Sequence, residues 1–328
     1  MRAVAVSIPG GPQVLHVREI DEPHLTHDQV LIRVHFAAVN RDDISLRKGA
    51  FRFPYGATLF LGFECSGIIE SVGKNVSKWK IGDEVCALLD GAGYAEKVAV
   101  REGQVFPIPT GVSLREAASL PFAACTVWLS IFITSRLYRG ETLLIHGGSG
   151  GIDAFAIKAA KLGGSRVIVV AGDEEKLSYC VSIQADVCIN YKIEDFAARV
   201  KEETGGRGVD VILDCTGTHC FQKNIECLNV NGRLFIIGAL GATLYTQMDL
   251  RDLVTKRLTV QGGYLQNRSA RSKQLIIEDV KKNLWPAIGN REGMINPLVH
   301  QCFSFSEADE AHQLVETGHQ IGKVLLVP

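Results

Sequence analysis

The sequence predicts an α/β protein in which a β-rich domain is joined to a doubly wound parallel sheet. The chain of 328 residues, 46% of them hydrophobic, is long enough to bury more than one core. Up to about residue 120 it contains strand-like runs closed by glycines, without a dominant helical period. From about Arg139 short apolar strands alternate with amphipathic helices, which is the pattern of a parallel sheet covered by helices on both faces.

In the first part, several runs either alternate between apolar and polar residues or form short apolar stretches closed by glycine. They predict strands at residues 29–39, 66–73, 82–89 and 94–100. Short strands separated by glycines indicate a compact, barrel-like β domain.

In the second part, each short apolar run is followed by a segment with a helical period. The predicted strands cover 142–146, 166–172, 186–190, 209–217 and 232–240, and the predicted helices cover 150–163, 173–184, 193–205 and 220–229. Within residues 303–327 a capped helix precedes a last apolar strand, which we expect to return to the first domain. The predicted domains are 1–123 together with 286–328, and 124–285.

Charge and composition exclude several kinds of partner. The net charge of −1 gives no general attraction to nucleic acid or to an anionic membrane, so we expect a small organic substrate. No apolar run reaches the ~18 residues of a membrane span, and the N-terminus turns polar too early for a signal peptide. Nine cysteines without a Cys-x-x-Cys pair indicate reduced thiols and a cytoplasmic protein.

The stretch from Thr142 to Gly164 has the layout of a nucleotide site: a strand, a cluster of glycines and a helix. The amides and dipole at such a helix start favour a pyrophosphate. Gly148 and Gly150 fill the first two positions of a Gly-x-Gly-x-x-Gly pattern, but Asp153 stands at the last. Asp153 is expected to push the helix outward or to point along its first turn, either repelling the pyrophosphate or capping the helix. We predict a Rossmann-type site that survives this substitution.

Several further motifs occur along the whole chain in a fixed order. They include AAVNRDDISLRKGAF at 37–51, LGFECSGIIESVG at 61–73, LLIHGGSGGI at 143–152, VDVILDCTG at 209–217 and IGKVLLV at 321–327. In these motifs the chain resembles the zinc-free quinone oxidoreductases of the medium-chain dehydrogenase/reductase superfamily, most closely the p53-inducible quinone oxidoreductase group. The resemblance implies a GroES-like catalytic domain, a Rossmann domain and hydride transfer to a quinone.

The resemblance also implies that both zinc sites are absent. Zinc-dependent relatives place a ligand cysteine at the position of Asn40 and a ligand histidine at that of Phe63, and neither residue here completes a nitrogen and sulfur tetrahedron. Glu64, the residue after Phe63, is then a structural carboxylate. A quinone suits such a site because it accepts hydride from a nicotinamide without a Lewis acid.

Three residues are implied at the reaction site. Asn40 lies by the nicotinamide, Phe51 borders the quinone pocket where close relatives have a tyrosine, and Thr126 lies near the carboxamide. Two alternatives stay open, because Asn40 can instead stabilise a turn and Thr126 can bond its own helix backbone.

The expected cofactor is NADPH. Lys176 and Tyr191 match the NADPH-binding relatives, whereas Asp173 replaces a hydroxyl and would repel the 2′-phosphate by ~1 kcal/mol or more. NADH is therefore the alternative, and Asp173 is also suited to cap the next helix. The other implied cofactor contacts are Gly148, Ser149, Gly150, Gly151, Ile152, Gly172, Thr216, Gly217, Gly238, Leu265 and Lys323.

Two other functions compete with quinone reduction. One is reduction of the activated double bond of an enone or alkenal. The other is a catalytically weak, dinucleotide-binding redox sensor, indicated by Asp153, Asp173 and Phe51 together. The quinone oxidoreductases that the chain resembles commonly dimerise through an edge strand of the nucleotide sheet, here residues 257–263. The resemblance therefore implies a homodimer.

Overall fold

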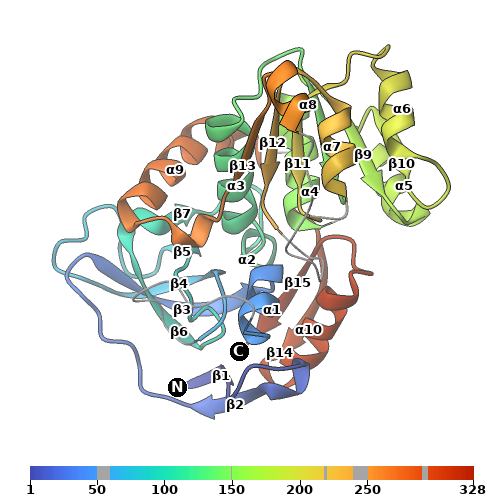
Figure 1. Cartoon of the computed structure of the whole chain (residues 1–328). Helices are drawn as coiled ribbons and strands as arrows, with labels where there is room; N and C mark the ends of the chain where they lie inside the picture. Colours follow the sequence, from blue (N-terminus) through green and yellow to red (C-terminus); the bar gives the residue numbers. More distant parts are fainter. Residues whose placement is uncertain (50–59, 149, 218–219, 239–249, 290–294) are drawn as a thin grey trace. The chain divides into compact units, whose positions relative to one another are not determined.

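The computed structural model describes residues 1–49, 60–148, 150–217, 220–238, 250–289 and 295–328 (Figure 1). The chain divides into two compact units. The first unit comprises Met1–Cys125 and Gln266–Pro328, and the second comprises Thr126–Leu265.

The second unit is built on a six-stranded sheet in which every neighbouring pair is parallel. Its strands are β8 (Thr142–His146), β9 (Arg166–Ala171), β10 (Val187–Asn190), β11 (Val209–Asp214), β12 (Leu228–Ile236) and β13 (Thr259–Gly262). The order β10-β9-β8-β11-β12-β13 reverses between β8 and β11, which makes their carboxyl ends the topological switch point. The predicted doubly wound sheet is confirmed.

Helices connect these parallel strands, as the alternation in the sequence predicts. They are α4 (Gly151–Leu162), α5 (Glu174–Ser182), α6 (Phe196–Glu203), α7 (Phe221–Cys227) and α8 (Leu250–Thr255), with the π-helix η3 (Trp128–Thr134) ahead of β8. A fully apolar cluster fixes α6 and α7 to the sheet, because Val200 and Ile225 pack with Leu144, Ile168 and Ile212. Strands that are apolar on both faces are buried in this way in parallel sheets.

The first unit is rich in β structure. Its strands are β1 (Arg2–Val6), β2 (Leu15–Glu19), β3 (Gln29–Ala38), β4 (Glu64–Val72), β5 (Glu84–Leu88), β6 (Lys97–Arg101), β7 (Val105–Pro107), β14 (Val299–Ser304) and β15 (Lys323–Val327). The main sheet has the order β14-β15-β3-β4-β5-β7, with β6 also paired to β3, and β1 pairs with β2. The last strand returns to this sheet as predicted, since Leu325 lies opposite Ala38 in an antiparallel pair.

The helices of the first unit are short, apart from two near the C-terminus. They are α1 (Arg41–Arg47), α2 (Leu114–Ala117), α9 (Ala270–Asn283) and α10 (Ala308–Thr317), while α3 (Pro121–Val127) runs across the boundary between the units. Single 3-10 turns are η1 (Pro12–Val14), η2 (Glu102–Gln104), η5 (Leu265–Asn267), η6 (Trp285–Ala287) and η7 (Phe305–Glu307).

The chain re-enters the first unit at Gln266, earlier than the boundary at 286 expected from the sequence. Helix α9 causes the difference. The Lys273 ammonium donates to the Asp90 carboxylate at 2.5 Å, the Lys281 ammonium donates to the Val105 carbonyl at 2.5 Å, and the Trp285 indole donates to the Pro107 carbonyl at 2.9 Å. These bonds attach α9 and the turn after it to the β-rich unit.

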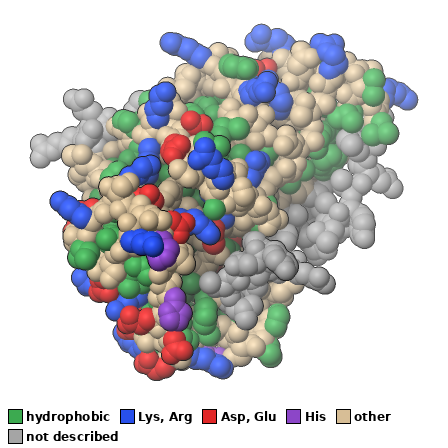
Figure 2. Space-filling model, turned by 90° about the vertical axis from the view of Figure 1, so that its left-hand side faces the viewer, with side chains coloured by type: hydrophobic (Ala, Val, Ile, Leu, Met, Phe, Trp, Pro, Cys, Tyr) green, Lys and Arg blue, Asp and Glu red, His purple; other side chains and the backbone are tan. Residues whose placement is uncertain are grey.

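Positive and negative side chains are both present on the surface, in keeping with the net charge of −1. On the face drawn in Figure 2, basic side chains are interspersed with acidic ones. Each helix within the described ranges is too short or too polar to cross a bilayer.

Candidate functional site

The glycine loop lies at the carboxyl end of β8, beside the switch point of the sheet. Gly147 and Gly148 have φ values of +114° and +135°, which side-chain-bearing residues rarely adopt. A Cβ atom on Gly148 would lie 2.5 Å from the Cys180 sulfur. Glycine is therefore needed at these two positions of the loop. Without side chains, the loop exposes its backbone to a ligand at the start of α4.

The other expected residues of this loop follow directly. Gly150 is the N-cap of α4, and Gly151 and Ile152 lie in its first turn. Ser149 lies outside the described residues. The Asp153 carboxylate turns back onto the loop, where its Oδ2 accepts the Gly148 amide at 3.0 Å. It thus acts as a carboxylate cap of the loop rather than pointing along the helix.

The ends of β9 and β10 bring together the residues expected at the adenosine ribose. The Tyr191 ring would lie 2.6 Å from a Cβ atom on Gly172, so the exposed ring packs over the bare backbone of this glycine. Asp173 is the N-cap of α5 and accepts the backbone amide of Lys176 at 3.1 Å. The capping role considered for Asp173 is therefore present, and its carboxylate is held at the start of the helix.

A buried polar network at the end of β11 was not anticipated from the sequence. Asp214 is fully buried and accepts the amides of Thr216 at 2.7 Å and Gly217 at 3.1 Å. Its second oxygen accepts the Asn224 amide at 3.1 Å, and the Asn224 oxygen bonds the His146 ring at 2.6 Å. Burial lowers the pKa of His146, so the ring is neutral. The network fixes the loop at the switch point.

The sequence does contain a signal for this network: an aspartate ends an otherwise apolar strand directly before Thr216. Since the Thr216 hydroxyl also donates to Asp214, at 2.7 Å, it is engaged within the loop. Two more predicted cofactor contacts, Gly238 and Leu265, lie in this unit. A Cβ on Gly238 would lie 3.1 Å from the Cys215 carbonyl, and Leu265 is buried.

In the first unit, Asn40, Glu64 and Lys323 form one buried cluster. The Lys323 ammonium lies 2.7 Å from the Glu64 carboxylate and 2.5 Å from the Asn40 oxygen. The Asn40 amide donates to the same carboxylate at 3.0 Å, and the other Glu64 oxygen accepts the Phe122 amide at 2.9 Å. Lys323, expected at the cofactor, is therefore ion-paired to the carboxylate beside Asn40.

Apolar side chains border this cluster. Phe63 is buried and its ring stacks on that of Phe122, with centroids 6.1 Å apart. Phe51 lies outside the described residues. The position that holds a histidine ligand in zinc-dependent relatives is thus part of an aromatic pair.

A second chain of buried polar groups runs from α1 to α10. Asp43 accepts the amides of Asn40 and Gly62, and burial raises its pKa to about 7. The Tyr94 hydroxyl bonds the His312 ring at 3.2 Å, and the other ring nitrogen lies 3.2 Å from Arg47. Burial, reinforced by the Arg47 guanidinium, lowers the pKa of His312 to about 3. The Asp43 carboxylate thus holds the backbone at Asn40 and Gly62.

Replacing His312 with glutamine is expected to reduce the loss of stability in acid. The folded chain keeps His312 neutral down to about pH 3, whereas the unfolded histidine binds a proton below its ordinary pKa of 6.5. As the pH falls through this window, the wild type loses about 1.4 kcal/mol per pH unit from this group. The variant loses none from it.

Urea unfolding of both proteins at several pH values measures this effect. The stability advantage of the wild type over His312→Gln should shrink as the pH is lowered. Asp43, whose raised pKa acts with the opposite sign, is present in both proteins and cancels in the difference. A difference that does not change with pH would contradict the assignment.

Thr126 has an unsatisfied hydroxyl. Its Oγ1 is buried and finds no hydrogen-bond partner among the residues that the structure describes. The alternative that this hydroxyl bonds its own helix backbone is therefore wrong. The hydroxyl of Ser130 instead donates to the Thr126 carbonyl at 2.7 Å. A buried hydroxyl without a partner is costly unless a ligand supplies one.

Replacing Thr126 with valine is expected to weaken dinucleotide binding by about tenfold without lowering stability, because the variant loses one ligand hydrogen bond and removes an unsatisfied group. Thr204→Val is the matched control in the same unit. The Thr204 hydroxyl donates to Val200 at 2.8 Å and accepts Gly208 at 3.0 Å, so its loss should cost stability and leave binding unchanged. Calorimetric titration and urea unfolding measure both quantities. Unchanged binding by Thr126→Val would refute a ligand contact.

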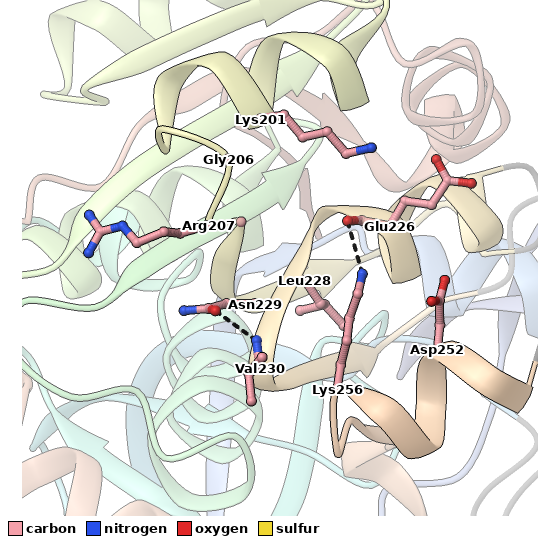
Figure 3. A pocket seen from close by; sticks show the side chains of 10 residues that line it. Lys201, Gly206, Arg207, Glu226, Leu228, Asn229, Val230, Asp252 and Lys256 are labelled. Carbon is pink, nitrogen blue, oxygen red and sulfur yellow. Dashed lines mark hydrogen bonds between the residues drawn. The ribbon is translucent and has the colours of Figure 1, made fainter.

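A pocket of about 430 Å³ lies elsewhere in the second unit, at the amino ends of β11 and β12 (Figure 3). Basic and acidic side chains line it together, among them Lys201, Arg207, Glu226 and Asp252. The Lys256 ammonium bonds the Glu226 carbonyl at 3.3 Å. None of the predicted site residues lines this pocket, which lies at the opposite strand ends from the glycine loop.

Comparison with known protein families gives two matches, separated by residues 111–150. Residues 26–110 match the alcohol dehydrogenase GroES-like domain, and residues 151–281 match the zinc-binding dehydrogenase family. The quinone oxidoreductase of Rattus norvegicus is 28% identical over 330 residues, covering 100% of this chain and 98% of that protein.

Solved structures agree with these matches. A quinone oxidoreductase of Escherichia coli, complexed with NADPH, aligns over 100% of both chains with a TM-score of 0.89 and 25% identity. An NAD-dependent alcohol dehydrogenase aligns over 100% of both chains with a TM-score of 0.86 and 29% identity. The similarity therefore extends over both units and the whole length of the chain.

Proposed function

We propose that this chain, which belongs to the medium-chain dehydrogenase/reductase superfamily of oxidoreductases, reduces quinones with NADPH by hydride transfer and without zinc. The observation that carries the proposal is the strand order of the second unit, which puts a glycine loop and a helix start beside the switch point. Full-length similarity to quinone oxidoreductases supports the choice of acceptor.

The residues present fit a nicotinamide dinucleotide. Gly147 and Gly148 carry no side chain that would keep a ligand from the loop backbone, and the amino end of α4 favours a pyrophosphate. The Thr126 hydroxyl, which has no hydrogen-bond partner among the described residues, supports a contact with a polar group of the cofactor. Tyr191 and Lys176 support NADPH over NADH, although Asp173 opposes the 2′-phosphate. Dissociation constants for both cofactors test this preference, and tighter binding of NADH would reverse it.

The residues at the expected zinc positions, in contrast, do not fit a zinc ion. At the positions of the catalytic ligands the chain has the Asn40 amide and the apolar Phe63, which provide no nitrogen and sulfur tetrahedron. The Lys323 ammonium already supplies the positive charge beside Glu64. Within the described ranges, no group of three or more His, Cys, Asp and Glu side chains is arranged to hold a metal ion. The residues at these positions therefore do not fit a catalytic zinc ion.

Both units contribute residues to the proposed hydride transfer. The bound nicotinamide supplies the hydride, and water supplies the proton that completes the hydroquinone. The glycine loop and α4 bind the dinucleotide, and the Asp214 network keeps the neighbouring loop in position. Glu64 and Lys323 hold the Asn40 side chain in one orientation, which limits the geometries available at the reaction site.

Oxidation of NADPH and NADH with ortho- and para-quinones and with enones tests the proposal. We expect turnover with quinones and NADPH, and no loss of activity after treatment with a chelator. Turnover with enones alone would replace quinone reduction by double-bond reduction. Cofactor binding without turnover of any acceptor would favour a redox sensor.

We also propose a homodimer in the cytoplasm. β13 is the last strand at its end of the parallel sheet, so it offers an edge for a second copy. All nine cysteines are free thiols, which suits a reducing compartment. Sedimentation of the whole chain should give the mass of a dimer, and a monomer mass would contradict the proposal.

A further inference from the structure

The glycine loop of this chain already holds a negative charge. The Oδ2 atom of Asp153 accepts the amide of Gly148 at 3.0 Å. The same atom would lie 2.5 Å from a Cβ on Gly147 and 3.2 Å from a Cβ on Gly150. The carboxylate therefore fills the space that Gly147 and Gly150 leave open by having no side chains.

Helix α4 stabilises the carboxylate in this place. Asp153 lies in the first turn of the helix, where backbone amides and the helix dipole favour a negative charge. These are the interactions that a pyrophosphate would use at the same helix start. The side chain and a bound phosphate thus compete for one amide and one small volume.

We propose that the Asp153 carboxylate occupies the phosphate position of the glycine loop in the free chain, so that a dinucleotide binds only after displacing it. The inference rests on the proposed function, since it assumes that this loop is the pyrophosphate site. Asp153 is then an affinity-determining residue. It lowers the affinity for every ligand that places a phosphate on the loop. Both nicotinamide cofactors contain a pyrophosphate, so the affinity for both should be lowered.

Asp153 and Asp173 consequently have different effects. Asp173 is held at the start of α5, at the end of the next strand, where a negative charge separates NADPH from NADH. Asp153 acts at the loop itself and should weaken both cofactors by the same factor. Two carboxylates at two loops thus control affinity and cofactor preference separately.

Calorimetric titration with NADPH, NADH and inorganic pyrophosphate tests the inference on the whole chain. Asp153→Gly removes the carboxylate and should tighten binding of all three ligands by about tenfold. Asp153→Asn keeps an oxygen for the Gly148 amide but removes the charge, so its gain should be smaller. Asp252→Asn, in the pocket of Figure 3, removes one charge at the opposite strand ends and should change nothing.

The outcomes separate the two proposals. Equal or weaker binding of NADPH and pyrophosphate by both Asp153 variants would overturn the inference. Tighter pyrophosphate binding by Asp153→Gly, with no binding of either dinucleotide, would support an occupied loop and refute the proposed cofactor. No binding of any ligand by any variant would refute both. If Asp153→Gly unfolds, Asp153→Asn alone decides, because it retains the loop contact.

Discussion

Replacement of Lys323 with methionine is expected to lower the free energy of unfolding by about 3 to 5 kcal/mol. The side chain of Glu64 is fully buried, and Lys323 is the cation beside it, 2.7 Å away. Without the ammonium, the partners that the carboxylate keeps within the described part of the chain are the Asn40 and Phe122 amides. A buried charge that has lost its ion-pair partner is strongly destabilising, whereas loss of the whole pair costs less.

The double variant Lys323→Met with Glu64→Gln tests this explanation. It should recover most of the lost stability in urea unfolding, because the second substitution removes the unpaired charge. Lys97→Met is the control in the same unit. Lys97 lies 2.8 Å from Glu22 in a partly exposed ion pair, so its loss should cost far less stability than the loss of Lys323. Equal destabilisation by Lys97→Met and Lys323→Met would contradict the importance of the buried cluster.

Replacement of Asp214 with alanine should abolish dinucleotide binding and lower the free energy of unfolding by about 3 to 5 kcal/mol. The carboxylate is the acceptor for Thr216, Gly217 and Asn224, and each buried donor that is left unsatisfied costs about 1 to 3 kcal/mol. Because this loop lies at the switch point, its collapse should remove the surface that faces the cofactor.

Two further variants separate loop position from general stability. Asp214→Asn should be milder, because Asn224 can turn its amide and the neutral His146 can change tautomer to re-pair the network. Asp210→Ala removes a carboxylate from the other end of β11, where it accepts the Thr142 amide at 2.8 Å. It should reduce stability but leave the NADPH dissociation constant unchanged. Undiminished NADPH binding by Asp214→Ala would refute the role of the network.

The sequence was most informative where local rules determine structure. Apolar strands that alternate with amphipathic helices gave the parallel sheet, and the glycines after β8 gave the loop at its switch point. The capping of α5 by Asp173 follows from a residue type that prefers the N-cap. The domain boundary was less accurate, because the docking of α9 depends on Lys273, Lys281 and Trp285 finding partners far away in the chain.

The buried clusters required the three-dimensional structure. The motif at the C-terminus predicts that Lys323 contacts the cofactor, yet the pairing of β15 with β3 brings it to Asn40 and Glu64. No local pattern connects residues so distant in sequence. Asp153 was recognised as an exception to the glycine pattern, but the direction of its side chain depends on the backbone of Gly148. The role of Phe51 remains a prediction from the resemblance.

In the proposed reaction, the second unit binds a nicotinamide dinucleotide whose hydride passes to a quinone without a metal. The most direct test of this proposal is a single-turnover reaction of chelator-treated chain, NADPH and a quinone, followed by the absorbance of the reduced nicotinamide. We expect rapid oxidation, slowed by deuterium on one face of the nicotinamide C4 and unaffected by deuterium on the other. Absorbance that stays constant with every quinone, or oxidation that begins only when zinc is added, would contradict the account.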